Sequence, residues 1–343
     1  MQLDERKKRI LEAVIREYVK TAEPVGSRSI ARQSDLGVSA ATVRNEMSDL
    51  EEMGYLEQPH TSAGRIPSEK GFRYFVDCMM EPEELTDRDQ DFLRRMLGEK
   101  INGLEDLVQQ TSNVLSNFSH YASLVISPAP QGDEGFRKME LIPLEPGRAL
   151  LVLITDKGMI MHRKLDVDAG LTMHDLEQVS TIFNQQLVGT RIKNMRTTVL
   201  QSLRHELLHR RQLMDAALEV VDDLLVSSQE DKIRVSGALN ILNEPEFKDL
   251  DKLKRILGVL EEEQFIKKLL EDKNLNEVKI KIGQENEVEQ VRELSIVFTA
   301  YELGDGTVGR IGLIGPVRMQ YWRASATVNT VRNIIQDMVD QFK

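Results

Sequence analysis

Apolar residues recur every three or four positions near the start of the chain, the spacing of an amphipathic helix. They are Ile10, Leu11, Val14, Ile15, Tyr18 and Val19. After a break that contains Pro and Gly, Ser27 predicts a short second helix that runs to about Ser34. Ser39 then has the position of an N-cap for a third helix over residues 40–53, which Gly54 ends. Two helices joined by a short Gly-containing turn indicate a helix-turn-helix.

The third helix has two faces of different character. An apolar stripe is expected to face the core, and its members are Val43, Met47, Leu50 and Met53. The opposite face carries short or polar side chains, namely Ala41, Thr42, Arg44, Asn45 and Ser48. An arginine and an asparagine on such a face suit the major groove, where they can reach guanine and adenine edges. A solvated surface is the alternative for an isolated helix.

A hairpin is predicted after the third helix. Residues 55–58 have the composition of a short strand, and residues 59–67 form a loop with small residues at its tip. We interpret this loop as a wing that contacts DNA, through His60, Thr61, Ser62, Gly64 and Arg65. The helix that follows would offer Lys70 and Arg73 to backbone phosphates. Ser39 completes the expected DNA-binding set. For the loop, the alternative is an ordinary surface hairpin that does not contact DNA.

The rest of the chain mixes helices and strands. An acidic stretch at residues 81–84 predicts a domain boundary, before a long helix over residues 86–119. Strands are expected at 122–126, 138–143, 149–155, 159–165, 278–282, 294–301 and 307–314, and a closing helix at 325–342. Two blocks of strands separated by a helical middle indicate an α+β domain with an insertion.

The helical middle contains a long apolar stripe. Its members are Leu200, Leu203, Leu207, Met214, Ala217, Val221 and Leu224, with Arg210 as the polar exception. This spacing predicts a packed helix seam, and the pattern alone leaves open whether the seam lies within one chain or between two chains.

Charge and cysteine content restrict the function. The net charge of −11 argues against a nucleic-acid partner, since positive side chains supply much of the affinity for phosphates. However, residues 1–80 hold 12 Lys+Arg and 13 Asp+Glu, so a nearly neutral head precedes an acidic body. Cys78 is the single cysteine, which excludes an internal disulfide. With no long apolar run and no signal sequence, we expect a cytoplasmic protein.

One motif points to a different chemistry. Residues 205–209 satisfy the HExxH pattern of zinc peptidases, in which two histidines bind the metal. Both histidines lie outside the apolar stripe, and the arginines beside them would oppose a divalent cation. We therefore expect no metal, no cofactor and no enzymatic activity, with a zinc peptidase as the alternative.

Three stretches of the sequence, residues 39–73, 236–247 and 312–321, resemble the family of the heat-inducible transcription repressor HrcA. Gln320 stands where an acidic residue is expected and Trp322 follows; neither lies in the expected DNA-binding set. The resemblance implies a winged helix-turn-helix, then a GAF-like α+β domain interrupted by a dimerising insertion. The expected domains are residues 1–80, the two GAF-like parts 81–170 and 231–343, and the insertion 171–230.

The resemblance also implies a function. It predicts a homodimer that represses chaperone operons by binding an inverted-repeat operator of the CIRCE type in double-stranded DNA. It further implies the GroE chaperonin as a partner that keeps the repressor active. The alternative is a winged-helix regulator whose GAF-like domain binds a small molecule.

Overall fold

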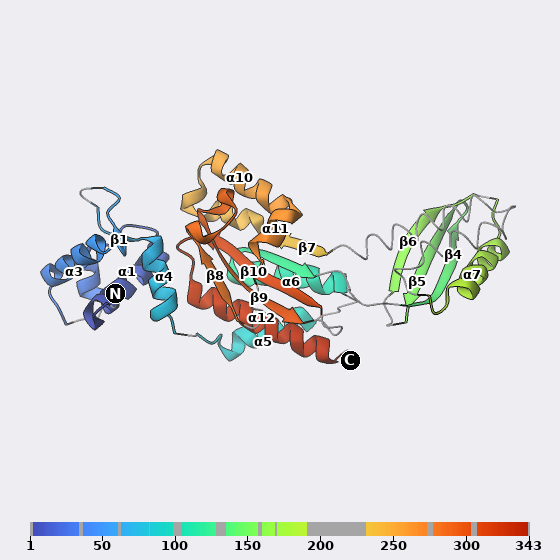
Figure 1. Ribbon diagram of the computed structural model, residues 1–343, viewed down its shortest axis with the longest axis horizontal. Coiled ribbons are helices and arrows are strands. Elements are labelled where there is room, and N and C mark those ends of the chain that lie inside the picture. The colour runs from blue at the N-terminus through green and yellow to red at the C-terminus, as the bar shows by residue number, and fades with distance from the viewer. Residues whose placement is uncertain are drawn as a thin grey trace. The chain divides into compact units, whose positions relative to one another are not determined.

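The structure is a computed structural model that divides the chain into two compact units. One unit comprises Met1–Ser127 and Lys232–Lys343, and the other comprises Pro128–Asp231 (Figure 1). The described residues are 3–33, 37–60, 63–81, 83–98, 104–127, 135–156, 160–168, 170–190, 231–272, 277–302 and 307–341. Among these residues, no helix has the length and apolar character needed to cross a membrane.

The first part of the chain, residues 3–81, is called the head here. Its elements are α1 (Glu5–Thr21), α2 (Ser27–Gln33), α3 (Ala40–Glu52), β1 (Leu56–Glu57), β2 (Ile66–Pro67) and α4 (Glu69–Cys78). The side chains of Asp4, Ser39 and Ser68 each accept a hydrogen bond from a backbone N–H in the first turn of the next helix. The helices and the hairpin predicted for this segment are confirmed.

The same unit contains a second domain, called the sheet domain here. Its helices are α5 (Asp87–Gly98), α6 (Leu104–Ser119), α10 (Leu250–Glu261), α11 (Glu263–Leu269) and α12 (Tyr321–Gln341), with short 3-10 helices η1 (Ala238–Asn243), η2 (Pro245–Phe247), η3 (Gly283–Glu285) and η4 (Glu289–Val291). Its strands are β3 (Ala122–Ser127), β7 (Lys232–Ser236), β8 (Lys279–Ile282), β9 (Leu294–Glu302) and β10 (Val308–Pro316). The long helix expected over 86–119 is described as α5 and α6, and residues 99–103 lie outside the described residues.

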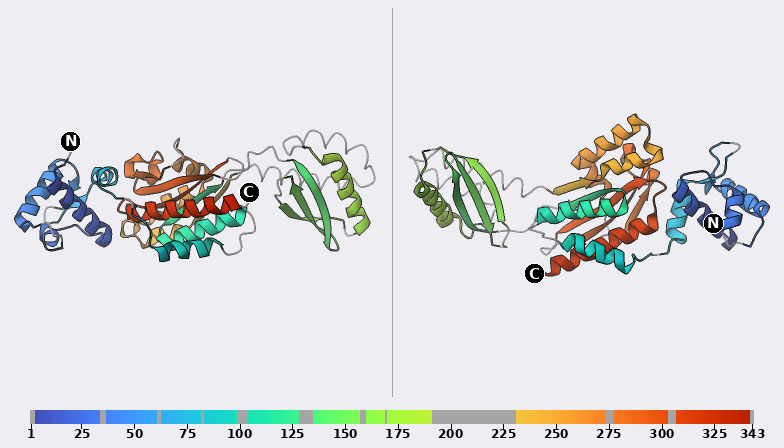
Figure 2. Two further views of the ribbon diagram at one scale, coloured as in Figure 1. Left: turned by 90° about the horizontal axis from the view of Figure 1, so that it is seen from below. Right: turned by 180° about the vertical axis from the view of Figure 1, so that it is seen from behind.

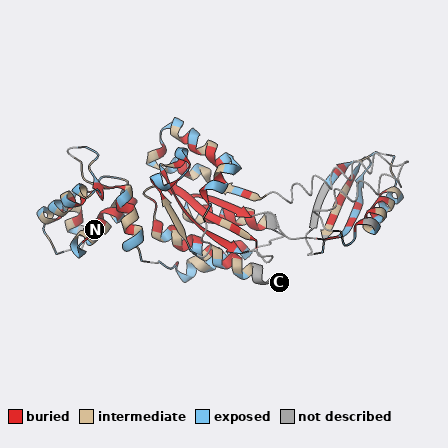
Figure 3. Ribbon diagram, viewed as in Figure 1, coloured by how far each residue is buried: buried red, intermediate tan, exposed pale blue. Residues whose placement is uncertain are grey.

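The five strands form an antiparallel sheet in the order β7-β3-β10-β9-β8. Helices cover both of its faces: Val125 and Leu313 pack in the same core as α6 and α12, while Leu124 and Ile314 pack in the core that contains α10 and α11 (Figure 2). Central strands covered on both sides need apolar residues in succession, and β3, β9 and β10 are buried along nearly their whole length (Figure 3).

The second unit has its own sheet, and it corrects the expected domain boundaries. Strands β4 (Phe136–Glu145), β5 (Arg148–Thr155) and β6 (Ile160–Asp166) pair only in the order β4-β5-β6, and α7 (Met173–Leu187) packs on them. We expected these strands in the first part of the GAF-like domain, with an insertion from residue 171. That division is wrong, because the strands pair with one another and not with β3, so the insertion begins after Ser127.

Candidate nucleic-acid interface

Helix α3 presents the expected polar face. Val43, Met47 and Leu50 are buried in the head core, which holds the helix in one rotation. On the other side Ala41, Arg44 and Asn45 are exposed, and Thr42 and Ser48 are half-buried at its edges. The Ser39 hydroxyl accepts a hydrogen bond from the Thr42 backbone N–H at 3.2 Å, so Ser39 has a structural role as the cap of this helix.

Two acidic residues of α3, Glu46 and Asp49, are paired within the head. Lys7 of α1 lies 2.7 Å from a carboxylate oxygen of Glu46 and 3.0 Å from one of Asp49. Hydrogen bonds to these two carboxylates raise the pKa of Lys7, so the side chain stays charged. These ion pairs reduce the repulsion that α3 would exert on phosphates. The sequence pattern missed this role of Lys7, because the partners are 39 and 42 residues apart and pair only in the fold.

The base of the wing is built around Val25. Strands β1 and β2 pair antiparallel, and the backbone N–H of Arg65 donates to the Val25 carbonyl at 2.9 Å. A Cβ at Gly64 would overlap the backbone of Val25, so this position accepts only glycine. Gly64 was expected beside DNA, and the structure gives it a packing role at the base of the wing. His60 is exposed, and Thr61 and Ser62 lie outside the described residues.

Arg65 binds the third helix rather than standing free. Its Nε lies 2.8 Å and its Nη2 2.7 Å from Oε2 of Glu51, near the end of α3. Its side chain is 20% exposed. The ion pair joins the wing to α3, and the phosphate contact that we predict for Arg65 stays a prediction.

Lys70 and Arg73, expected to be available to phosphates, are engaged within the chain. The Nζ of Lys70 donates to the Met53 carbonyl at 2.7 Å and lies 4.5 Å from the centre of the Tyr55 ring. The Arg73 guanidinium binds Glu285 of η3 and also donates to the Ile280 carbonyl at 2.7 Å. Arg73 therefore contributes to the contact between head and sheet domain. Sequence spacing could not reveal this contact, because its partners are more than 200 residues away.

Other predicted features lie outside the described residues. They include the whole apolar stripe from Leu200 to Leu224 and the HExxH motif at 205–209. Among the residues that are described, no group of three or more His, Cys, Asp or Glu side chains is placed to hold a metal ion. Arg28 of α2 is a further exposed cation of the head that the sequence pattern did not single out.

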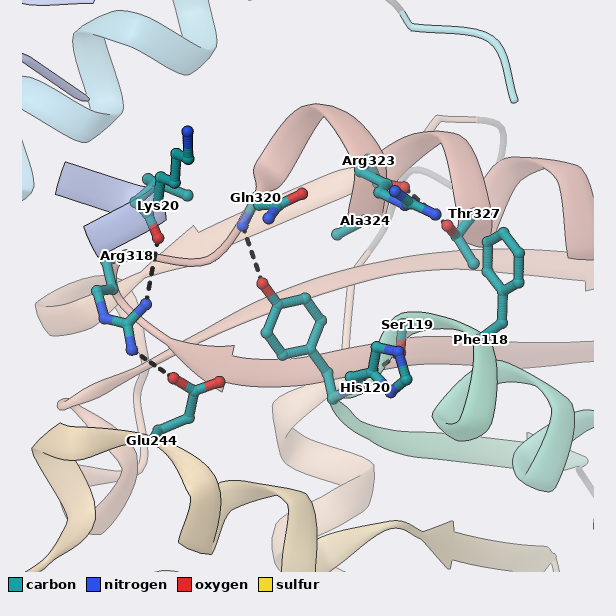
Figure 4. A pocket seen from close by; sticks show the side chains of 12 residues that line it. Lys20, Phe118, Ser119, His120, Glu244, Arg318, Gln320, Arg323, Ala324 and Thr327 are labelled. Carbon is teal, nitrogen blue, oxygen red and sulfur yellow. Dashed lines mark hydrogen bonds and ion pairs between the residues drawn. The ribbon is translucent and has the colours of Figure 1, made fainter. Parts of the chain in front are cut away.

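A cavity of about 410 Å³ lies between the end of α1, the end of α6 and the start of α12. Figure 4 shows the side chains around it, among them Lys20, His120 and Arg323. The Tyr121 hydroxyl accepts a hydrogen bond from the Gln320 backbone N–H at 3.1 Å on one side of the cavity. Burial is the main reason that the pKa of Tyr121 is raised, so this hydroxyl keeps its proton.

Helix α3 is capped and has an exposed polar face, and the hairpin that follows it pairs with Val25, just before α2. This arrangement is that of a winged helix-turn-helix protein. The family model described as "HrcA protein C terminal domain" matches residues 105–324. The heat-inducible transcription repressor HrcA of Carboxydothermus hydrogenoformans is 41% identical over 337 residues, 98% of each chain. That of Moorella thermoacetica is 40% identical over 342 residues, 99% of each chain. The chain belongs to the HrcA family of heat-inducible transcription repressors.

A solved structure shows the same fold over the whole chain. The crystal structure of a hypothetical protein at 2.2 Å resolution has a TM-score of 0.74 and 20% sequence identity, and the match covers 100% of both chains. The family model and the curated relatives confirm the resemblance found in three stretches of sequence, and they place the chain in a family of transcription repressors.

Proposed function

We propose that this repressor acts as a homodimer on an inverted-repeat operator of the CIRCE type, upstream of chaperone operons. Each head places α3 in the major groove of one half-site, with Arg44 and Asn45 on the base edges. Ala41, Thr42 and Ser48 complete that surface. The wing, with His60, Thr61, Ser62 and Arg65, lies along the sugar–phosphate backbone.

The observation that carries this proposal is the exposed face of α3. Arg44 and Asn45 are its exposed long polar side chains toward the start of the helix, and three acids of α3 (Glu46, Asp49 and Glu51) are held in ion pairs. The pairing of these acids with Lys7 and Arg65 lowers the repulsion between α3 and phosphates. Small neighbours such as Ala41 let the backbone approach a base pair closely.

The test is a binding titration with a duplex that carries the inverted repeat from the chaperone promoters of the same organism. Arg44→Ala or Asn45→Ala should each cost about 1–3 kcal/mol and relax the preference at particular base pairs. Arg88→Ala is the matched control, because it removes one exposed arginine of the sheet domain. Should both α3 variants bind as tightly as the control, α3 is not the reading element.

The dimer and the chaperonin partner belong to the same proposal. The stripe from Leu200 to Leu224 is the segment that we expect to join two chains, because its apolar spacing suits a two-chain helix seam. The GroE chaperonin is expected to bind this protein and keep it active, as the family resemblance implies. Copurification of the two proteins, with and without heat treatment, tests that part.

A second candidate is a small-molecule sensor, and the cavity of about 410 Å³ favours it. Cavities of this size commonly take small ligands. Lys20, His120 and Arg323 on its walls would select an anion. Thermal-shift measurements with anionic metabolites test this candidate, with Lys20→Ala as the variant that should remove any shift.

A further inference from the structure

The head contacts the sheet domain through α1 and α4. The Phe72 ring packs edge-on against Tyr321 at 5.8 Å between ring centres, and Phe75 packs in the same way against Trp322 at 5.9 Å. Arg16 of α1 places its guanidinium 4.9 Å from the centre of the Trp322 ring. These side chains come from elements other than α3, so the contact leaves the polar face of α3 exposed.

Arg318 lies at the centre of a polar part of this contact. It follows β10, its side chain is 13% exposed, and its guanidinium binds both Glu244 and Glu246. Figure 4 shows the pair with Glu244. Its Nη1 also donates to the Val19 carbonyl at 3.3 Å, in the last turn of α1. Carbonyls in the last turn of a helix lack partners within the helix and attract cations.

The partners of Arg318 come from two different parts of the chain. Glu244 and Glu246 flank the start of η2, and Val19 belongs to the head. A guanidinium can bind two carboxylates and a carbonyl at once because its donors fan out in one plane. A lysine at this position has one nitrogen and could not bind both carboxylates and the Val19 carbonyl with this geometry.

We propose that Arg318 is a positioning residue that holds the end of α1 on the sheet domain and so fixes the orientation in which the head presents α3. This inference rests on the proposed DNA-binding function. A dimer that reads an inverted repeat must bring two heads to two half-sites at one spacing. A head that is free to rotate on residues 79–86 loses that preorganisation and binds the repeat more weakly.

The single tryptophan of the chain makes the contact measurable without DNA. Trp322 is half-buried and lies against Phe75 of the head. Arg318→Gln should release the head and raise the acrylamide quenching constant of this tryptophan about two-fold. Arg255→Gln is the control, since it removes one exposed arginine of α10 that takes part in none of these contacts.

The second measurement compares two duplexes. Arg318→Gln should weaken binding to the inverted repeat about ten-fold, while binding to an isolated half-site stays within about two-fold of the unmodified protein. Equal losses on both duplexes, or unchanged quenching of Trp322, would overturn the inference. If Arg318→Gln lowers the melting temperature of the whole unit, Glu246→Gln replaces it, because it keeps the side-chain volume and removes only the charge.

The quenching measurement needs no DNA, so it tests the role of Arg318 separately from the proposed DNA-binding function. Failure of the unmodified protein to bind the inverted repeat would refute the proposed function, and the quenching of Trp322 would still decide whether Arg318 holds the head.

Discussion

Arg65 has a role in the fold, and we predict that it has a second role in binding DNA. Its guanidinium pairs with Glu51 at 2.7 Å in a partly buried position, so it must leave or share this carboxylate to reach a phosphate. Phosphate contacts by arginine depend on salt and hardly on sequence, because they release counterions. Removing the arginine and removing its carboxylate partner should therefore change DNA affinity in opposite directions.

Arg65→Ala should weaken binding to operator and random duplex by similar factors, and reduce the slope of log affinity against log salt by about one. Glu51→Gln should do the opposite and tighten both complexes, because it frees the guanidinium and removes a negative charge. Binding titrations at several salt concentrations measure both. A Glu51→Gln protein that binds as weakly as Arg65→Ala would mean that the ion pair acts by holding the wing on α3.

Glu244 gives a prediction on pH. Burial raises its pKa, although Arg318 opposes the shift. A carboxyl whose folded pKa is raised stabilises the fold most at pH below its unfolded pKa, and this contribution is lost as pH rises through the folded pKa. Glu244→Gln should therefore melt at an equal or higher temperature than the unmodified protein at about pH 8 and gain nothing at about pH 4. A variant that melts lower at pH 8 would show that the charge of Glu244 stabilises the contact.

Helix α3 depends on its first turn. Ser39 accepts a hydrogen bond from the Thr42 N–H, and Val43 begins the apolar stripe one turn in. Ser39→Ala should lower the free energy of unfolding of the head by about 1 kcal/mol. Ser39→Asp should keep the cap and the stability while it weakens DNA binding through its charge. Urea unfolding combined with operator titration checks both. A Ser39→Ala protein as stable as the unmodified one would show that this cap does not stabilise α3.

The strands of the two sheets differ in burial because their surroundings differ. Strand β3 is covered by helices on both faces and is buried throughout, whereas β4 has α7 on one face and alternates between buried and exposed positions. Strand β4 is also an edge strand, and Asn184 and Ser180 of α7 bind its backbone at Met139 and Leu141. These bonds occupy groups that could otherwise pair with another chain.

At the scale of the whole molecule, the insertion enters and leaves the sheet domain at neighbouring points. Ser127 at the end of β3 and Lys232 at the start of β7 face each other in the antiparallel ladder. Replacing residues 128–231 with a two-residue Asn-Gly turn should leave the first unit folded, since such a turn joins paired strands directly. The shortened protein should be monomeric in sedimentation and bind the inverted repeat no better than a half-site.

The full-length comparison for this prediction is Leu207→Asp with Leu224→Asp, which keeps the insertion and places charges in the expected seam. This double variant should also be monomeric in sedimentation, like the shortened protein. A shortened protein that remains a dimer would place the dimer contact in the first unit.

Local signals in the sequence determined the helices of the head. Ser39, the stripe from Val43 to Leu50 and the turn at Gly54 act within a few residues of one another, so spacing alone located α3. The strands of the two larger sheets were also predicted from alternation and apolar runs, except β7, for which no strand was predicted. The resemblance in three stretches then identified the family.

Only the tertiary structure decided which strands share a sheet and which charges share a partner. Strand β3 pairs with β7 more than a hundred residues later, and Arg73 pairs with Glu285 across 212 residues. Such contacts depend on the packing of the whole chain, because any strand of suitable length or any free carboxylate could have been the partner. The exposed face of α3 was predictable because its signals lie within one helix. The contact of Arg318 with α1 was not, because it depends on how distant segments pack.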